Sequence, residues 1–170
     1  LKLPSWLFAD FSGVSNATST VCNARLQVAF DLRNMCFEIF ALDSYSHNDL
    51  AAASSLPLRP GDLALRDRGY LTAAETSRHI ECGAHCIYRH KTGTNYRDPV
   101  TLELFDLLGL LQKQGTCDIN VTLNDEKRTP VRLVAAPVDQ ETAALRRMKA
   151  KKESKGHNPS AEVLALMDWT

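Results

Sequence analysis

Residues 61–70, GDLALRDRGY, contain the acidic side chain whose position best suits chemistry. A short apolar run ends at Asp67, and Gly69 interrupts the chain before an amphipathic stretch begins. In α/β folds, ligands and metals gather at the carboxyl ends of strands. A carboxylate held there by the sheet stays open to solvent, which suits a ligand of a divalent cation. The same pattern, an acid before Arg-Gly, is also typical of a plain turn that leaves a strand.

A second group of reactive side chains occupies residues 79–90. It consists of His79, Cys82, His85, Cys86 and His90. Such a mixture raises the question of a zinc site. If Gly83 separates a helix from a strand, however, His85 and Cys86 point to opposite faces of the sheet. The spacing therefore disfavours structural zinc.

A basic run at residues 146–155, RRMKAKKESK, has six basic residues in ten. The electrostatic potential around this run is positive, although the chain as a whole has 20 basic and 20 acidic residues. Contacts to a phosphate backbone are one interpretation, and a solvated helix face is the other. The candidate DNA contacts are Arg146, Arg147, Lys149, Lys151 and Lys152, together with Arg68 beside Asp67. For Arg68, pairing with a surface acid is the alternative.

Composition indicates a soluble globular chain, with 44% hydrophobic and 24% charged residues in 170. No apolar run reaches the roughly 18 residues that span a bilayer, and no secretory signal is visible. The five cysteines are an odd number, which favours free thiols in a reducing cytoplasm: Cys22, Cys36, Cys82, Cys86 and Cys117. We therefore expect a cytoplasmic protein. The neutral total charge argues against a domain that is basic throughout.

The elements that must position these residues follow from periodicity and from turn signals. In chain order, the first part is predicted to contain strands at 24–32 and 35–42, a helix at 46–55, a strand at 62–66, a helix at 72–82 and a strand at 85–90. A polar linker follows at 91–99. The second part is predicted to contain a helix at 100–112, paired strands at 117–123 and 130–137, a charged helix at 139–155 and a short helix at 161–167. The order of the first part predicts a mixed α/β sheet with an antiparallel hairpin.

Four stretches follow one another in an order that matches a known family. They are residues 1–4 with the loop and hairpin up to 42, the segment 61–70, the run TPVRLV at 129–134, and the basic run continuing to 158–162 and 168–170. Together they resemble the bacterial insertion-sequence DDE transposases whose catalytic domain carries an inserted β-rich segment. The likeness covers nearly the whole chain.

The resemblance implies an incomplete ribonuclease H-like core in residues 1–91. It also implies that residues 92–170 are an insertion, with a small β-sheet and helices, that leads back to the core. Asp67 matches the second of three catalytic, metal-binding acids. The first would precede Leu1, and the third would follow Trp169 on a helix of pattern Tyr-x-x-Arg-x-x-x-Glu-x-x-x-x-x-x-Lys. We therefore expect a fragment that lacks two of the three acids.

The activity implied is cleavage and transfer of double-stranded DNA at transposon ends with Mg²⁺ or Mn²⁺. Such assemblies often pair two subunits, so a homodimer is an implied partner. Because one Asp cannot hold two cations tightly, we expect this chain alone to be inactive. Two alternatives are a non-catalytic DNA- or protein-binding module derived from a transposase, and another nuclease on the same core.

Overall fold

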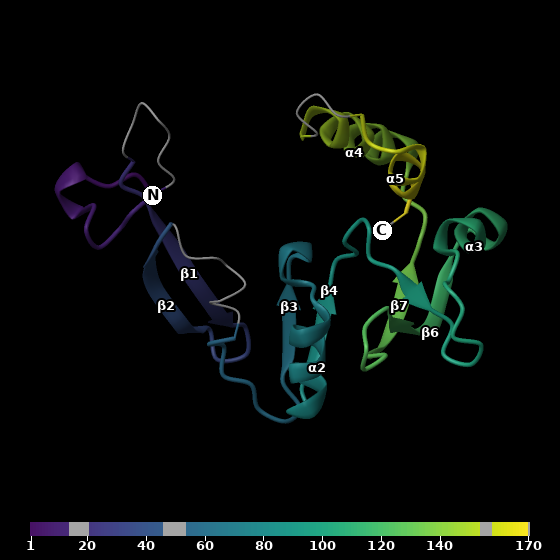
Figure 1. Ribbon diagram of the computed structural model, residues 1–170, viewed down its shortest axis with the longest axis horizontal. Helices are drawn as coiled ribbons and strands as arrows, with labels where there is room; N and C mark the ends of the chain where they lie inside the picture. Colours follow the sequence, from purple (N-terminus) through teal and green to yellow (C-terminus); the bar gives the residue numbers. More distant parts are fainter. Residues whose placement is uncertain (14–20, 46–53, 154–157, 170) are drawn as a thin grey trace. The chain divides into compact units, whose positions relative to one another are not determined.

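The computed structural model of the 170-residue chain describes residues 1–13, 21–45, 54–153 and 158–169. Within these residues, seven strands form three small sheets beside four α-helices and two 3₁₀ helices (Figure 1). The predicted mixed α/β class is therefore confirmed. The chain divides into two compact units, Leu1–Asp62 with Cys82–Ala84 and Leu63–Glu81 with His85–Thr170, and each is described by itself.

The helices and strands follow the chain in a simple order. They are η1 (Ser5–Leu7), β1 (Ala24–Asp31), β2 (Cys36–Ser44), β3 (Leu63–Arg66), η2 (Arg68–Tyr70), α2 (Ala73–Glu81), β4 (His85–Tyr88), β5 (Tyr96–Arg97), α3 (Leu107–Gln114), β6 (Cys117–Leu123), β7 (Pro130–Ala135), α4 (Gln140–Glu153) and α5 (Ala161–Leu166). The predicted helix at 46–55 falls largely on residues 46–53, outside the described residues.

The first unit is built on the antiparallel hairpin β1–β2, which confirms the pairing predicted from alternation. Val28 lies opposite Phe40 in the ladder. The turn is held by Asp31, whose Oδ1 accepts hydrogen bonds from the N–H groups of Arg33 and Asn34 at 2.7 and 3.0 Å. These bonds satisfy two backbone donors of the turn, as Asp does in Asx-type turns.

One face of this hairpin is apolar and open. Phe37 contacts both Phe30 and Phe40 edge to face, with ring centroids 5.0 and 5.3 Å apart. The apolar side chains of the hairpin that remain between 42% and 66% exposed are Leu26, Val28, Phe30, Phe37, Phe40 and Leu42. A two-stranded hairpin with an uncovered apolar face is marginally stable by itself.

The second unit begins with β3, α2 and β4, in which the two strands pair in parallel. Thr72 caps α2 because its Oγ1 accepts the N–H of Glu75 at 3.2 Å, and Gly83, at φ +69°, ends the turn before β4. The predicted strand–helix–strand order is confirmed. Three apolar side chains of the pair are more than half exposed: Leu63, Leu65 and Ile87.

The second part of this unit is the antiparallel sheet β5–β6–β7. The predicted pairing of β6 with β7 is confirmed, whereas the two-residue strand β5 was not predicted. Tyr96 of β5 packs with Val121 and Leu123 of β6 in the buried cluster of this sheet. Burial on one face of a small sheet is what fixes its register.

The predicted helix at 100–112 is wrong in its first half, because α3 begins only at Leu107. Asp98 accepts hydrogen bonds from the N–H groups of Val100 and Thr101, both at 2.8 Å, and so closes a turn there. Asp106 then caps α3. Asp side chains favour such turns and caps over helix interiors, and this preference outweighs the apolar periodicity.

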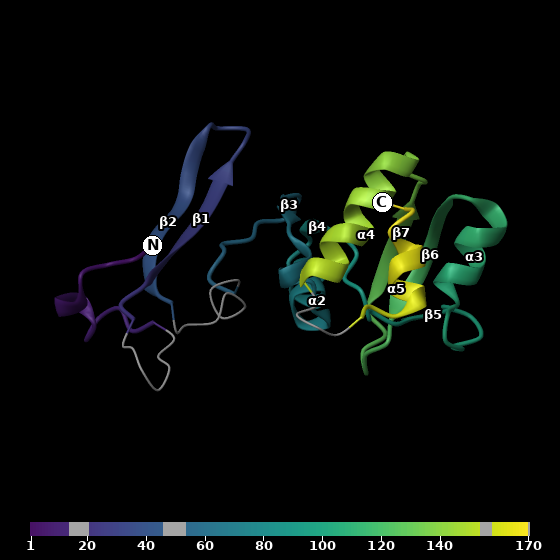
Figure 2. The ribbon, with the colours of Figure 1, turned by 90° about the horizontal axis from the view of Figure 1, so that it is seen from above.

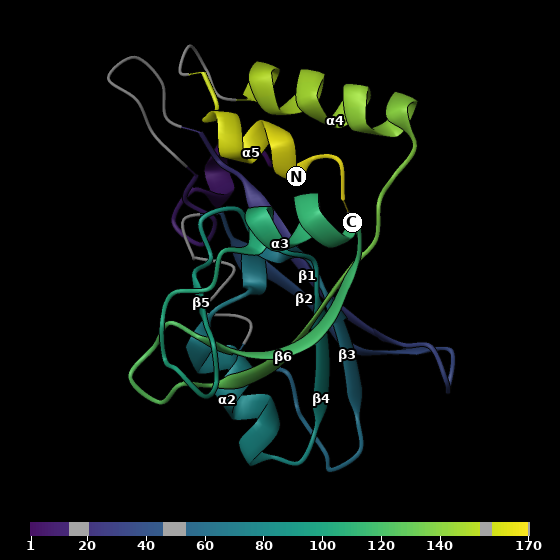
Figure 3. The ribbon, with the colours of Figure 1, turned by 90° about the vertical axis from the view of Figure 1, so that its right-hand side faces the viewer.

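The helices at the end of the chain agree with their prediction over the described residues. Asp139 accepts the N–H of Thr142 at 2.8 Å before α4, and Ser160 accepts the N–H of Val163 at 3.3 Å in α5. α5 lies between α4 and α3 in each of two perpendicular views (Figures 2 and 3).

The predicted joining of the strands into one sheet is also wrong. β1–β2 and β3–β4 are separate two-stranded sheets over the described residues, whereas the pattern predicted one mixed sheet. Hairpin and crossover pairings are local, while a joined sheet needs pairing between distant segments. Of the five free cysteines, only Cys36 is exposed. Among the helices described, none has the length and apolar content needed to span a bilayer.

Candidate functional site

Asp67 is the first residue after β3, so its carboxylate lies at the carboxyl end of the parallel pair. The last residue of β3 pairs in register with the last residue of β4. Arg89, the first residue after β4, therefore comes beside Asp67, and its Nη2 lies 2.9 Å from Asp67 Oδ1. Both side chains are exposed, by 66% for Arg89 and 61% for Asp67. Sequence reasoning missed Arg89, although strand register would have indicated it.

The surroundings of Asp67 favour its anionic form. The backbone N–H of Arg68 lowers the pKa of Asp67 below its ordinary value, and the positive charge of Arg89 acts in the same direction. A hydrogen bond donated to a carboxylate favours the charged form, as does a nearby cation. Asp67 is therefore ionised at neutral pH and offers anionic oxygen to a cation or to a donor.

A partly buried ion-pair network joins β3 to α2 directly before Asp67. Arg66 Nη1 lies 2.9 Å from Glu75 Oε2, and Arg78 Nη2 lies 3.1 Å from the same oxygen. Burial raises the pKa of Glu75, but the hydrogen bonds and charges of Arg78 and Arg66 outweigh it and lower the pKa. The Arg66 guanidinium also lies 5.3 Å from the centre of the Tyr70 ring. These contacts fix the end of β3, and hence the backbone that carries Asp67.

Arg68 connects the neighbourhood of Asp67 to the basic helix α4. Its Nη2 lies 4.0 Å from Glu153 Oε2, at the last residue of α4. Lys149 Nζ lies 3.7 Å from the other oxygen of the same carboxylate. Lys149, Lys151 and Lys152 are exposed on this last part of the helix. The structure thus brings Arg68 and Lys149 to the same carboxylate, at the end of α4 that also carries Lys151 and Lys152.

Arg146 and Arg147 are engaged differently from the lysines. Arg146 donates from Nη1 to the backbone carbonyl of Trp169 at 2.9 Å. Arg147 forms an ion pair with Asp168. Both guanidinium groups therefore have a partner within the chain. The sequence offered no signal for this, because the partners are more than twenty positions away.

A metal site formed by this chain alone does not fit the described residues. They contain no group of three or more His, Cys, Asp or Glu side chains placed to hold an ion. The carboxylate of Asp67 faces the guanidinium of Arg89 instead of a second acid. Two divalent cations require several oxygen ligands, so Asp67 is at most one ligand of such a site.

The zinc interpretation of residues 79–90 receives no support in the described part of the chain. His79 is fully buried and its Nδ1 lies 2.7 Å from the carbonyl oxygen of Glu75. His90 Nδ1 lies 3.0 Å from the hydroxyl of Tyr96. Each histidine is thus held within its own local packing.

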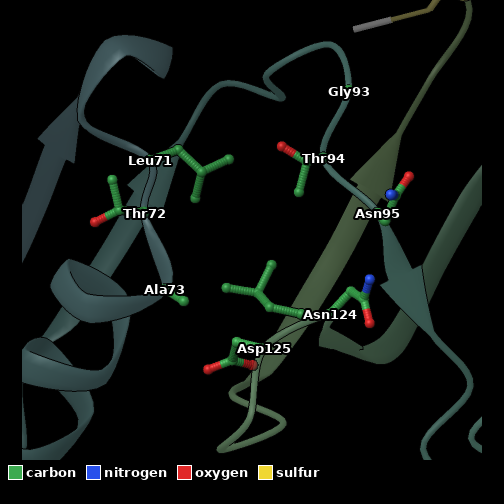
Figure 4. Close-up of a pocket in the computed structure, with 9 residues that line it drawn as sticks. Leu71, Thr72, Ala73, Gly93, Thr94, Asn95, Asn124 and Asp125 are labelled. Atoms are coloured by element: carbon green, nitrogen blue, oxygen red, sulfur yellow. The ribbon is translucent and has the colours of Figure 1, made fainter.

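A pocket of about 230 Å³ opens at the amino end of α2 (Figure 4). Thr72 and Ala73 of the helix start lie across it from Thr94 and Asn95, which lead into β5 (Figure 4). The remaining residues that line it are Leu71, Gly93, Leu123, Asn124 and Asp125. Sequence reasoning indicated the cap at Thr72 but not the pocket, because its walls are far apart along the chain.

Comparison with known proteins adds no relative. No protein-family model, curated protein or solved structure matches this chain.

Proposed function

We propose that this chain is part of the catalytic domain of a DDE transposase, which cleaves and transfers DNA strands at transposon ends. The observation that carries the proposal is the position of Asp67. It follows β3 at the carboxyl end of a parallel pair, next to Arg89, while Arg68 reaches the last residue of α4. An anionic ligand at a strand end with basic side chains nearby is compatible with a metal-dependent nuclease of DNA.

The fold proposed is a ribonuclease H-like core that this chain supplies in part. The hairpin β1–β2 and the parallel unit β3–α2–β4 are its two pieces, and the sheet β5–β6–β7 with α3, α4 and α5 is the insertion. The resemblance of residues 61–70 to the strand with the family's second acid supports this assignment. Asp67 is then a metal-binding catalytic acid.

In this reaction class Mg²⁺ or Mn²⁺ ions activate the attacking oxygen and stabilise the leaving one. This chain contributes Asp67 as an oxygen ligand, and the Arg68 N–H lowers the pKa of this carboxyl. Within the described residues, no group of three or more His, Cys, Asp or Glu side chains is placed to complete such a site. We therefore expect the chain by itself to bind these cations weakly and to leave DNA uncut.

The DNA would be held by positive charge near Asp67. Arg68 and the exposed lysines Lys149, Lys151 and Lys152 gather where α4 ends. Phosphate contacts by such side chains position the duplex without reading its sequence. Each contact contributes a salt-dependent part of the affinity.

A second candidate is a non-catalytic DNA-binding module derived from a transposase. The observation that favours it is the pairing of Asp67 with Arg89, because an acid neutralised by an arginine serves structure as well as chemistry. The two candidates differ in what the complete protein does to DNA.

The test compares two asparagine substitutions in the complete protein that contains this chain. Asp67→Asn removes the proposed ligand, and Asp118→Asn is its matched control, because Asp118 is also an exposed acid paired with an arginine, Arg132. We expect Asp67→Asn to abolish Mn²⁺-dependent cleavage of transposon-end DNA while binding persists, and Asp118→Asn to preserve both. Cleavage by Asp67→Asn at the wild-type rate would refute the catalytic assignment. Binding without cleavage by the unsubstituted protein would favour the second candidate.

A further inference from the structure

The segment at Asp168 and Trp169 is held by three different parts of its unit. Trp169 pairs with Pro137 in an antiparallel bridge, and the N–H of Val138 donates to the carbonyl of Asp168 at 2.9 Å. The indole N–H of Trp169 donates to the carbonyl oxygen of Gly115, after α3, at 2.7 Å. The residues that follow β7 and α3 therefore both contribute backbone contacts to this segment.

The third part is α4, which reaches the segment through two consecutive arginines. Arg146 donates to the carbonyl of Trp169 at 2.9 Å, and Arg147 pairs with the carboxylate of Asp168. The guanidinium group of arginine is planar and holds its N–H donors in a rigid arrangement. When it is half-buried and bonded to a carbonyl or a carboxylate, it limits how far the helix that carries it can move. α4 buries only Ala143 along its whole length, so it has little apolar packing to hold it otherwise.

We propose that Arg146, Arg147, Asp168 and Trp169 form a latch that orients α4. The basic run then has two roles: its two arginines are positioning residues, and its lysines are the phosphate contacts. This division rests on the proposed function, because it assigns the DNA contacts within the same surface. It revises the simple interpretation in which all five basic side chains of α4 contact DNA.

The latch matters for the site because of where α4 ends. Beyond the latch, Lys149 and Arg68 both approach the carboxylate of Glu153. A helix fixed near its middle by the latch and near its end by Glu153 has a defined direction. The latch and Glu153 therefore set where the backbone of Lys149 and Lys152 lies relative to the end of β3. Both lysines are exposed to solvent, Lys149 by 75% of its side chain.

The first test measures the latch without DNA. The chain has two tryptophans, and Trp6 is 78% exposed, so Trp6→Phe leaves Trp169 as the only tryptophan, which can be excited selectively over the tyrosines. In the Trp6→Phe background, we expect Arg147→Gln to raise the acrylamide quenching of Trp169. The Trp169→Phe variant, which retains only the exposed Trp6, gives the quenching constant of an exposed indole for comparison. Lys152→Gln, with the same charge change on the same helix, should leave the quenching unchanged. Asp168→Asn removes the ion pair from the other side and should reproduce the effect of Arg147→Gln.

The second test uses the salt dependence of binding to a duplex. We expect Lys149→Gln with Lys152→Gln to flatten the slope of log K against log salt by roughly 0.9 for each lost contact. Arg147→Gln should weaken binding with the slope unchanged. An unchanged quenching constant in both Arg147→Gln and Asp168→Asn, or a slope flattened by Arg147→Gln as by a lysine variant, would overturn the latch. If no variant binds DNA, the proposed function fails, and the quenching result still decides whether the latch exists.

Discussion

At the scale of single residues, two exposed acid–arginine pairs look alike, but the pKa of the acid is lowered by different causes in each. The pKa of Asp118 is lowered first by the side-chain hydrogen bond of Arg132. The pKa of Asp67 is lowered first by the backbone N–H of Arg68, with Arg89 as a lesser cause. The largest single cause of the lowered pKa of Asp67 thus comes from the conformation of the turn after β3 and not from its salt bridge.

This difference predicts unequal responses to removing each arginine. Arg132→Gln should raise the pKa of Asp118 most of the way to its ordinary value, whereas Arg89→Gln should raise the pKa of Asp67 only partly, because the Arg68 N–H remains. Carboxyl-carbon NMR titration measures both values. Since each folded-state pKa is depressed, the associated stability is present above the unfolded-state value of 3.8 and is lost as the pH falls through the folded-state value. An equal rise at both acids would contradict the argument.

At the scale of elements, local sequence signals were sufficient to predict a helix or strand where no other signal in the same segment opposed them. Alternation predicted β1–β2, and the cap at Thr72 with Gly83 predicted the limits of α2. The helix at 100–112 failed because Asp98 and Asp106 hold the backbone more strongly than the apolar spacing does. The contact of Arg147 with Asp168 joins distant segments that leave no periodic pattern, so it could not be predicted. The contact of Asp67 with Arg89 was accessible in principle, because it follows from the register of β3 with β4.

The start of α3 offers a test of how capping and helix propensity compete. Asp106 Oδ1 accepts the N–H of Gly109 at 2.9 Å, and a Cβ at Gly109 would overlap the carboxylate of Asp106. Alanine normally stabilises a helix by about 1 kcal/mol over glycine, and loss of an Asp cap costs about 1 kcal/mol. We therefore expect Gly109→Ala to be nearly neutral in urea denaturation. In an Asp106→Ala background the same change should stabilise by about 1 kcal/mol. Equal effects in the two backgrounds would show that the cap is not displaced.

At the scale of the whole molecule, the chain combines zero net formal charge with an uncovered apolar surface on β1–β2. Proteins with little net charge repel one another weakly, and exposed apolar patches promote association. The charged face that we assign to DNA is local and does not change this balance.

A single charge on that apolar surface should therefore change the behaviour of the chain in solution. Phe40→Glu places a carboxylate on the apolar face opposite Val28, and Gln27→Glu adds the same charge on the other face of β1. We expect Phe40→Glu to lower the fluorescence of a bound apolar dye and the light scattering at pH 7. Gln27→Glu should lower the scattering less and leave the dye fluorescence unchanged. Identical effects of the two variants would mean that charge alone, and not the apolar face, governs association.

The unequal burial of the five thiols has a practical consequence. Burial raises the pKa of the Cys86 thiol and of the Cys117 thiol, which suppresses their reactive thiolate forms. Cys22 is buried, and Cys82 is only partly exposed. Cys36, at the start of β2, is exposed. A maleimide fluorophore added at neutral pH should therefore couple first to this hairpin, which gives the native chain an optical label without any engineered cysteine.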